Sequence, residues 1–103
     1  MPDFVKVAST HDLSPGQSAV VEIDGRPVAL FNVNGEFVAL DNVCLHRGGP
    51  LGEGFVDSQN MVVQCPWHGW TFSLIDGKCQ LGPGGVEKFE VKVDGAEVLV
   101  ALN

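Results

Sequence analysis

Two short stretches of the chain each combine a cysteine with a histidine. The first reads CLH, with Cys44 and His46 two positions apart, and the second reads CPWH, with Cys65 and His68 three positions apart. Residues 47–64 separate them. Thiolate sulfur and imidazole nitrogen are common ligands of zinc and iron in proteins. The two stretches therefore indicate one metal site assembled from two loops.

Three interpretations fit these four residues. The plainest is that the cysteines belong to the core and the histidines to the surface, because buried cysteine is common. A second is structural zinc, whose ligands usually come as a pair of cysteines followed by a pair of histidines. The third is a 2Fe–2S cluster in which two histidines replace two cysteines on one iron. In that case Cys44 and Cys65 bind one iron, and His46 and His68 bind the other.

The composition limits the class of protein. The chain has 103 residues, which suits a single domain, and a net charge of −7 with 13 acidic and 6 basic side chains. This charge argues against nucleic acid and anionic membranes as partners and favours a basic protein surface. Three cysteines do not suggest a disulfide framework. The start, MPDFVKVAST, lacks a basic segment followed by an apolar one, and no apolar run is long enough to span a membrane. We therefore expect a cytoplasmic protein.

The remaining sequence predicts antiparallel strands joined by tight turns. Asp24-Gly25, Asn34-Gly35, Asp76-Gly77 and Asp94-Gly95 each lie between runs of strand-forming residues. Such pairs favour the type I′ turn of a β-hairpin. The runs RPVALFNV and EFVAL are continuously apolar, which is typical of strands covered on both faces, and no stretch predicts a helix. The prediction is an all-β domain of short antiparallel strands.

The alternation stops between Asn42 and about Asn60, in a glycine-rich stretch that carries Cys44 and His46. We interpret this stretch as a functional loop. Glycines at 48, 49 and 69 would let backbone N–H groups approach the sulfides of a cluster. Gly52 and Gly54 are interpreted as ordinary loop residues.

The segments CLHRGGPLGEG and CPWHGWTF closely resemble those of soluble Rieske-type ferredoxins, which pass electrons to bacterial ring-hydroxylating oxygenases. The small subunits of some assimilatory nitrite reductases are similar. The resemblance extends over nearly the whole chain, because VEIDGRPVALFNVNGEFVAL also looks like the strands before the first ligand loop. It implies one Rieske 2Fe–2S cluster held by the four residues above.

The resemblance also implies a fold and partners. The fold is a Rieske fold of three small stacked sheets, with the cluster at one tip. Residues 1–103 would form one domain, with a cluster-binding subdomain of about residues 43–82 and a base of residues 1–42 and 83–103. The partners would be a flavin-dependent reductase and a terminal oxygenase of aromatic hydrocarbon catabolism, or the large subunit of a nitrite reductase. A monomer is expected.

Some residues depart from the pattern of Rieske proteins in cytochrome bc complexes. Gly49 and Trp67 stand where cysteines there form a disulfide, and Trp70 stands where a serine donates to a cluster sulfide. Fewer donors stabilise the reduced cluster less, so we expect a midpoint potential near the low end of the Rieske span, about −150 mV.

The remaining cysteine and histidine are given no part in the site. Cys79 is interpreted as structural, and Trp70 and Phe72 as core residues. His11 is the only histidine besides His46 and His68, so a second iron site with two histidines and a carboxylate cannot be built. The sequence therefore predicts a one-electron carrier that is not itself an enzyme.

Overall fold

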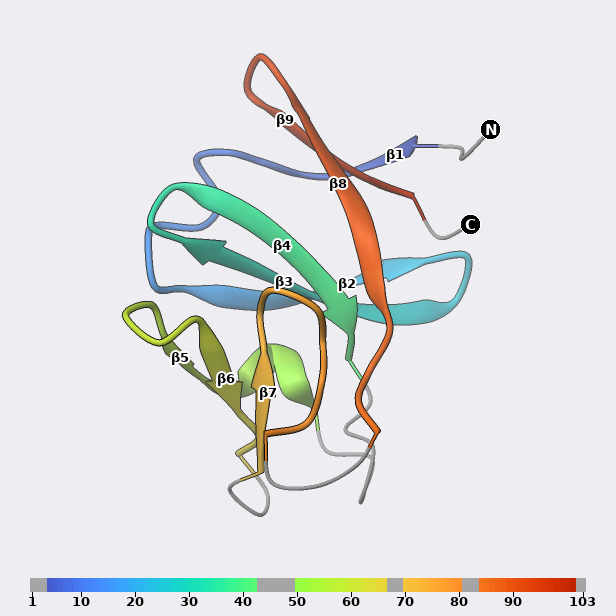
Figure 1. The fold of residues 1–103 in the computed structure, drawn as a ribbon. Coiled ribbons are helices and arrows are strands. Elements are labelled where there is room, and N and C mark those ends of the chain that lie inside the picture. Colours follow the sequence, from blue (N-terminus) through green and yellow to red (C-terminus); the bar gives the residue numbers. More distant parts are fainter. Residues whose placement is uncertain (1–3, 43–49, 67–69, 81–83, 102–103) are drawn as a thin grey trace.

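A computed structural model describes residues 4–42, 50–66, 70–80 and 84–101. In these ranges the chain forms antiparallel strands and one turn of 3-10 helix (Figure 1). The predicted all-β antiparallel class is confirmed. The elements in chain order are β1 (Phe4–Ser9), β2 (Ser18–Ile23), β3 (Arg26–Val33), β4 (Glu36–Asp41), η1 (Leu51–Glu53), β5 (Phe55–Asp57), β6 (Val62–Gln64), β7 (Thr71–Ser73), β8 (Lys88–Asp94) and β9 (Glu97–Ala101).

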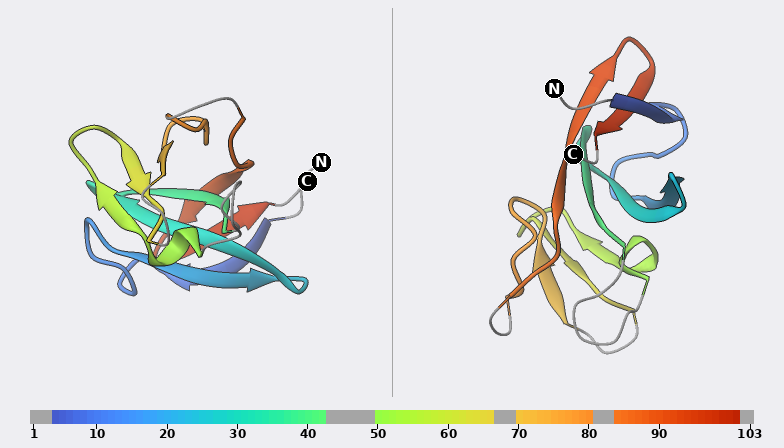
Figure 2. Two further views of the ribbon diagram at one scale, coloured as in Figure 1. Left: turned by 90° about the horizontal axis from the view of Figure 1, so that it is seen from below. Right: turned by 90° about the vertical axis from the view of Figure 1, so that its right-hand side faces the viewer.

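The described strands form two sheets. The larger has the order β1-β9-β8-β4-β3-β2, and the smaller has the order β5-β6-β7. The smaller sheet lies at the end of the molecule opposite the β8–β9 hairpin, as Figure 1 and the right view of Figure 2 show. The resemblance implied three sheets, whereas β8 pairs with both β9 and β4 and so joins two groups of strands into one.

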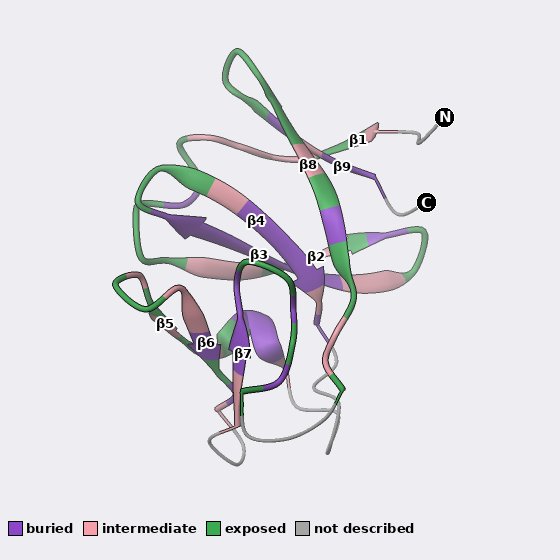
Figure 3. Cartoon of the chain, in the orientation of Figure 1, coloured by how far each residue is buried: buried purple, intermediate pink, exposed green. Residues whose placement is uncertain are grey.

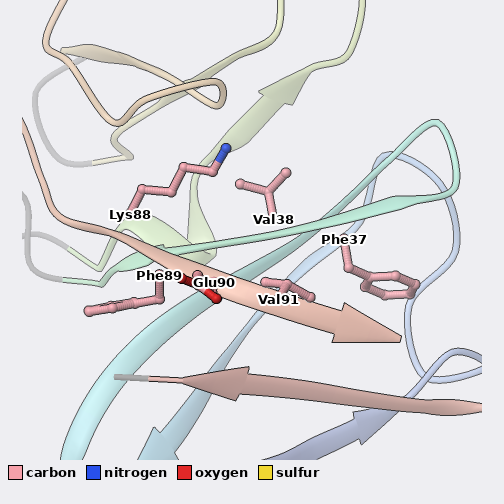
Figure 4. Close-up of a pocket in the computed structure, with 6 residues that line it drawn as sticks. All are labelled: Phe37, Val38, Lys88, Phe89, Glu90 and Val91. Atoms are coloured by element: carbon pink, nitrogen blue, oxygen red, sulfur yellow. The ribbon is translucent and has the colours of Figure 1, made fainter. Parts of the chain in front are cut away.

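The contact between β4 and β8 is short. The strands pair only at Ala39 with Phe89 and at Leu40 with Lys88, and β8 then continues alongside β9. Their separation leaves an open pocket of about 400 Å³ in the larger sheet (Figure 4). It is lined by Phe37, Val38, Lys88, Phe89, Glu90 and Val91.

Two of the four predicted turns form as expected. Asp24 and Gly25 join β2 to β3 with φ values of 51° and 79°, and Asn34 and Gly35 join β3 to β4 with 55° and 91°. Both residues of a type I′ turn need positive φ, which asparagine, aspartate and glycine adopt at low cost. These turns set the register of the β2–β3–β4 meander.

The other two turns connect antiparallel segments but differ in detail. Asp94 pairs with Glu97, so the two loop residues are Gly95 and Ala96, and only Gly95 has positive φ. Residues 74–77 form a wider turn in which the Gly77 N–H donates to the Ser73 carbonyl oxygen. At both places the Asp-Gly dipeptide correctly predicts that the chain reverses direction. It does not predict the exact position or the type of the turn.

Buried residues follow one another along the central strands β3 and β4 (Figure 3). Their side chains belong to two separate core clusters. Along β3, Phe31 and Val33 join the cluster that includes the smaller sheet, whereas Val28 and Leu30 join the cluster of the larger sheet. Side chains of a strand point alternately to its two faces. Burial on both faces explains the continuous apolar run that the sequence shows there.

Candidate metal centre

Three hydrogen-bonded pairs lie at the end of the molecule opposite the β8–β9 hairpin, which we call the loop end (Figures 1 and 2). Each pair flanks a segment outside the described residues: 43–49, 67–69 or 81–83. The bonds run from the Leu51 N–H to the Asn42 carbonyl oxygen at 2.7 Å, from the Cys65 N–H to the Trp70 carbonyl oxygen at 2.7 Å, and from the Cys79 N–H to the Gly84 carbonyl oxygen at 2.9 Å. The described residues on the two sides of each segment are thus joined by a backbone hydrogen bond.

The three pairs are connected to one another. Gly54 lies so close to β6 that an added Cβ would overlap the carbonyl oxygen of Gln64, the residue before Cys65. On the other side, the Gln80 N–H donates to the Thr71 carbonyl oxygen at 2.8 Å. The strands β6 and β7 flank segment 67–69. They therefore contact both Gly54, which follows segment 43–49, and Gln80, which precedes segment 81–83.

Of the four predicted ligands, the structure describes Cys65. It follows β6 directly and is 1% exposed. Cys44, His46 and His68 lie outside the described residues, as do Gly48, Gly49, Gly69 and Trp67. Where these residues lie relative to Cys65 stays a prediction.

The surroundings of Cys65 fit a thiolate ligand. Its side chain belongs to an apolar cluster with Leu51, Val63, Phe72 and Leu74. These apolar side chains exclude water, and in the described residues Cys65 forms no disulfide. A thiol buried in this way is suited to bind one iron of a 2Fe–2S cluster away from solvent, while the proposed ligand His68 binds the other iron.

The structure also describes the residues to which the sequence gives no part in the site. Cys79 is buried in the same cluster as Cys65, where it forms a β-bridge with Phe72. Phe72 is fully buried, and Trp70 is partly buried against that cluster. His11 is exposed. The core roles of Cys79 and Phe72 agree with their burial.

Three residues beside the site were not recognised from the sequence: Asn42, Gly52 and Gly54. The glycines were interpreted as ordinary loop residues, and this was wrong. A Cβ on Gly52 would lie 2.7 Å from Val20 Cγ2 and 2.8 Å from the Ala19 carbonyl oxygen. The predicted irregular stretch of residues 42–60 also contains η1 and β5. No motif or spacing in the sequence marks Asn42, because its side chain bonds Gly52, ten residues later in the chain.

Charged side chains also hold the end of β4, which precedes residues 43–49. Arg26 Nη2 donates to Asp41 Oδ2 at 3.0 Å and to Glu87 Oε1 at 3.1 Å, and its guanidinium lies 4.9 Å from the centre of the Phe89 ring. The hydrogen bonds to Asp41 and Glu87 raise the pKa of Arg26 above its ordinary value. Arg26 thereby connects the start of β3, the end of β4 and the segment before β8.

A similar local network closes the β5–β6 turn. Asn60 Nδ2 donates to Asp57 Oδ2 at 2.8 Å, and the backbone N–H groups of Gln59 and Asn60 donate to Asp57 Oδ1. The side-chain bond from Asn60 is the main reason that the pKa of Asp57 lies below its ordinary value. This turn keeps β5 in register with β6.

The chain belongs to the Rieske [2Fe-2S] domain family, whose model matches residues 3–100. The predicted cofactor, one Rieske 2Fe–2S cluster, is therefore confirmed, and the family favours it over structural zinc. Among the residues that the structure describes, no helix has the length and apolar character needed to cross a membrane.

Two relatives illustrate the range of proteins that contain this domain. The chain is 36% identical over 102 residues to the ferredoxin component of biphenyl 2,3-dioxygenase from Rhodococcus jostii (strain RHA1), covering 97% of this chain and 94% of that protein. It is 39% identical over 105 residues to apoptosis-inducing factor 3 of Homo sapiens, covering 98% of this chain but 17% of that protein. The chain thus spans a small part of the second relative and nearly all of the first.

Solved structures support the same fold. The ferredoxin of carbazole 1,9a-dioxygenase from Nocardioides aromaticivorans IC177 matches with a TM-score of 0.91 and 28% identity over 97% of this chain and 98% of that one. A chain from a complex of oxygenase and ferredoxin in carbazole 1,9a-dioxygenase matches at 0.85 and 32%, over 94% and 100%. A chain assigned as the small subunit of an NADH-dependent nitrite reductase from Mycobacterium tuberculosis matches at 0.91 and 27%, over 100% and 97%.

Proposed function

We propose that the chain is a one-electron carrier that accepts electrons from a flavin-dependent reductase and passes them to a terminal oxygenase of the aromatic ring-hydroxylating type. The observation that supports this most is the likeness, over nearly the full length of both chains, to the ferredoxin component of a biphenyl dioxygenase. A solved complex of a related ferredoxin with its oxygenase supports the oxygenase as the electron acceptor.

The proposed ligands are Cys44 and Cys65 for one iron and His46 and His68 for the other. When bound, a 2Fe–2S cluster supplies a reversible one-electron couple. The chain contributes a buried thiol at Cys65, an apolar cluster that excludes water behind it, and a backbone hydrogen bond from Cys65 to Trp70. These features support Cys65 as a ligand that is held in one position.

The proposed chain organisation is one domain of residues 1–103, with a cluster-binding subdomain of about residues 43–82 and a base of residues 1–42 and 83–103. We further propose that it acts as a soluble monomer in the cytoplasm. The net charge of −7 favours a basic protein partner over nucleic acid or an anionic membrane.

The chain supplies the electron rather than the catalytic site for substrate oxidation. A mononuclear iron held by two histidines and a carboxylate needs histidines beyond His46 and His68. Only His11 remains in these 103 residues. A separate oxygenase active site is therefore part of the proposal.

The second candidate function is the small subunit of a nitrite reductase. The match to the Mycobacterium tuberculosis chain, which covers nearly all of both proteins, is the observation that favours it. Size-exclusion chromatography with candidate partners separates the two functions, because a carrier elutes alone and a permanent subunit elutes with its large subunit.

Iron and acid-labile sulfide analysis tests the proposed centre. The purified protein should contain about two irons and two sulfides per chain. After reduction it should give the electron paramagnetic resonance (EPR) spectrum of a 2Fe–2S cluster with nitrogen ligands. Voltammetry should give a midpoint near −150 mV, at the low end of the range for Rieske centres. Stoichiometric zinc without sulfide would refute the proposal.

A further inference from the structure

Asn42 connects the two ends of the segment that carries the first pair of proposed ligands. Its carbonyl oxygen accepts a hydrogen bond from the Leu51 N–H, and its side-chain Oδ1 accepts one from the Gly52 N–H, both at 2.7 Å. Its own N–H donates to the Pro27 carbonyl oxygen at 3.4 Å. One residue therefore joins the end of β4, the start of η1 and the start of β3.

The bond from Gly52 to Asn42 is buried. Asn42 is 8% exposed, and Gly52 is buried as well. A buried N–H that loses its acceptor cannot turn to water without moving the backbone, and leaving it unpaired costs stability. The bond therefore favours one position of η1 relative to β4.

Gly52 is held on its other side by β2. Ser18 Oγ donates to the Gly52 carbonyl oxygen at 2.8 Å. A Cβ at Gly52 would meet Val20 Cγ2, the Ala19 carbonyl oxygen and Asn42 Oδ1 within 3.0 Å. The peptide groups of Gly52 are thus fixed between Asn42 and β2, so the far end of the segment is anchored to the larger sheet.

We propose that Asn42 is a positioning residue for the proposed cluster, because it fixes the residues on both sides of segment 43–49 relative to Cys65. This inference rests on the proposed ligand set. Asn42 lies two residues before Cys44, and the anchored η1 leads through Gly54 to Gln64 and Cys65. The Asn42 side chain thereby couples the base of one ligand loop to the base of the other.

The test replaces Asn42 by Leu in the full chain, which keeps a side chain of similar size but removes the acceptor. The rate at which a chelator removes the 2Fe–2S cluster, measured from the decrease in visible absorbance, should rise about tenfold. This is the factor expected when about 1.4 kcal/mol of stabilisation is lost. The EPR line shape of the reduced protein should also change. Asn42→Asp retains an acceptor oxygen and should restore cluster retention to near the original rate.

Asn32 provides a matched control. It is 4% exposed, its Nδ2 donates to the Leu13 carbonyl oxygen, and its Oδ1 accepts from the Gly35 N–H, each at 2.8 Å. Asn32→Leu therefore removes equivalent bonds in the larger sheet. Its unfolding free energy should fall, but its EPR spectrum and its rate of cluster loss should stay close to those of the original protein.

A second variant serves if Asn42→Leu does not fold. Ser18→Ala removes only the hydroxyl that holds the Gly52 carbonyl and should speed cluster loss about threefold, the factor for a bond worth roughly 0.6 kcal/mol. Equal rates for the Asn42, Ser18 and Asn32 variants would overturn the positioning role. Absence of a 2Fe–2S cluster from the unsubstituted protein would instead overturn the proposed function.

Discussion

Cys65 and Cys79 are two buried thiols of one apolar cluster for which the sequence predicts different roles. Both side chains are less than a tenth exposed, at 1% and 8%. Only Cys65 directly follows a strand and has a histidine three positions later in the sequence, whereas Cys79 forms a β-bridge with Phe72. Because the two cysteines are similarly buried but lie in different places, a substitution of Cys79 serves as a control for the same substitution of Cys65.

We predict that Cys65→Ala abolishes the cluster and Cys79→Ala does not. Loss of Cys65 removes one of two thiolates, and metal binding in such sites is coupled to loop folding. Cys79→Ala removes only a small apolar group and should lower the unfolding free energy by about 1 kcal/mol. Iron analysis and thermal unfolding of both variants check this. Full iron content in Cys65→Ala would show that the ligand assignment is wrong.

Single residues also show where sequence reasoning ends. Cys65 could be proposed as a ligand because a thiol and an imidazole at short spacing carry recognisable chemistry. Asn42 carries no such pattern, because its side chain acts on Gly52, ten residues away, through a bond that only the folded backbone creates. Periodicity and motif spacing do not report contacts of this kind.

At the level of elements, the shortest elements account for most of the difference between what the sequence predicts and what the structure shows. β3 and β4 were predictable because long apolar runs and two type I′ turns agree with each other. η1 and β5 have only three residues each, too few to show a period. They form because β5 pairs with β6 and because Leu51 is buried in the core.

We predict that Gly54→Ala impairs cluster retention although Gly54 is not a ligand. Its φ of −79° suits any residue, so the cost comes from overlap with the Gln64 carbonyl oxygen. Overpacking of this kind typically costs about 1–3 kcal/mol and shifts the backbone. The shift would act on the residue before Cys65, so both cluster retention and the unfolding free energy should fall.

Gly16→Ala is the control for that variant. Gly16 has no neighbour within 4 Å of an added Cβ, but its φ of +88° makes alanine unfavourable by roughly 1–2 kcal/mol. It should therefore destabilise the fold without faster loss of the cluster. If both variants lost the cluster at the same rate, general instability rather than the contact with Gln64 would be the cause.

The whole molecule has two distinct ends. The smaller sheet and the three hydrogen-bonded pairs lie at the loop end, and the β8–β9 hairpin extends at the other (Figure 2). Under the proposed ligand assignment the cluster lies at the loop end, and we predict that an electron-transfer partner binds there. The net charge of −7, by contrast, attracts a basic partner toward the molecule as a whole.

Variants of two acidic residues can distinguish a local interaction at the loop end from the attraction by the net charge. Glu53 is exposed in η1 at the loop end, and Asp94 is exposed at the end of β8. Glu53→Gln and Asp94→Asn each remove one negative charge, so they weaken the long-range attraction equally. We predict that Glu53→Gln slows electron transfer from the reduced reductase about threefold at physiological ionic strength, whereas Asp94→Asn changes it little, because the Debye length is then about 8 Å and only charges close to the partner act on it strongly.

Stopped-flow measurements across a range of salt concentrations check this, together with the midpoint potential of each variant to account for changes in driving force. The difference between the variants should shrink as salt rises, because screening weakens the local pair that Glu53 makes with the partner. A larger effect of Asp94→Asn than of Glu53→Gln would mean that the partner binds at the β8–β9 hairpin. The electron would then have to cross the larger sheet, and the proposed direction of approach would be wrong.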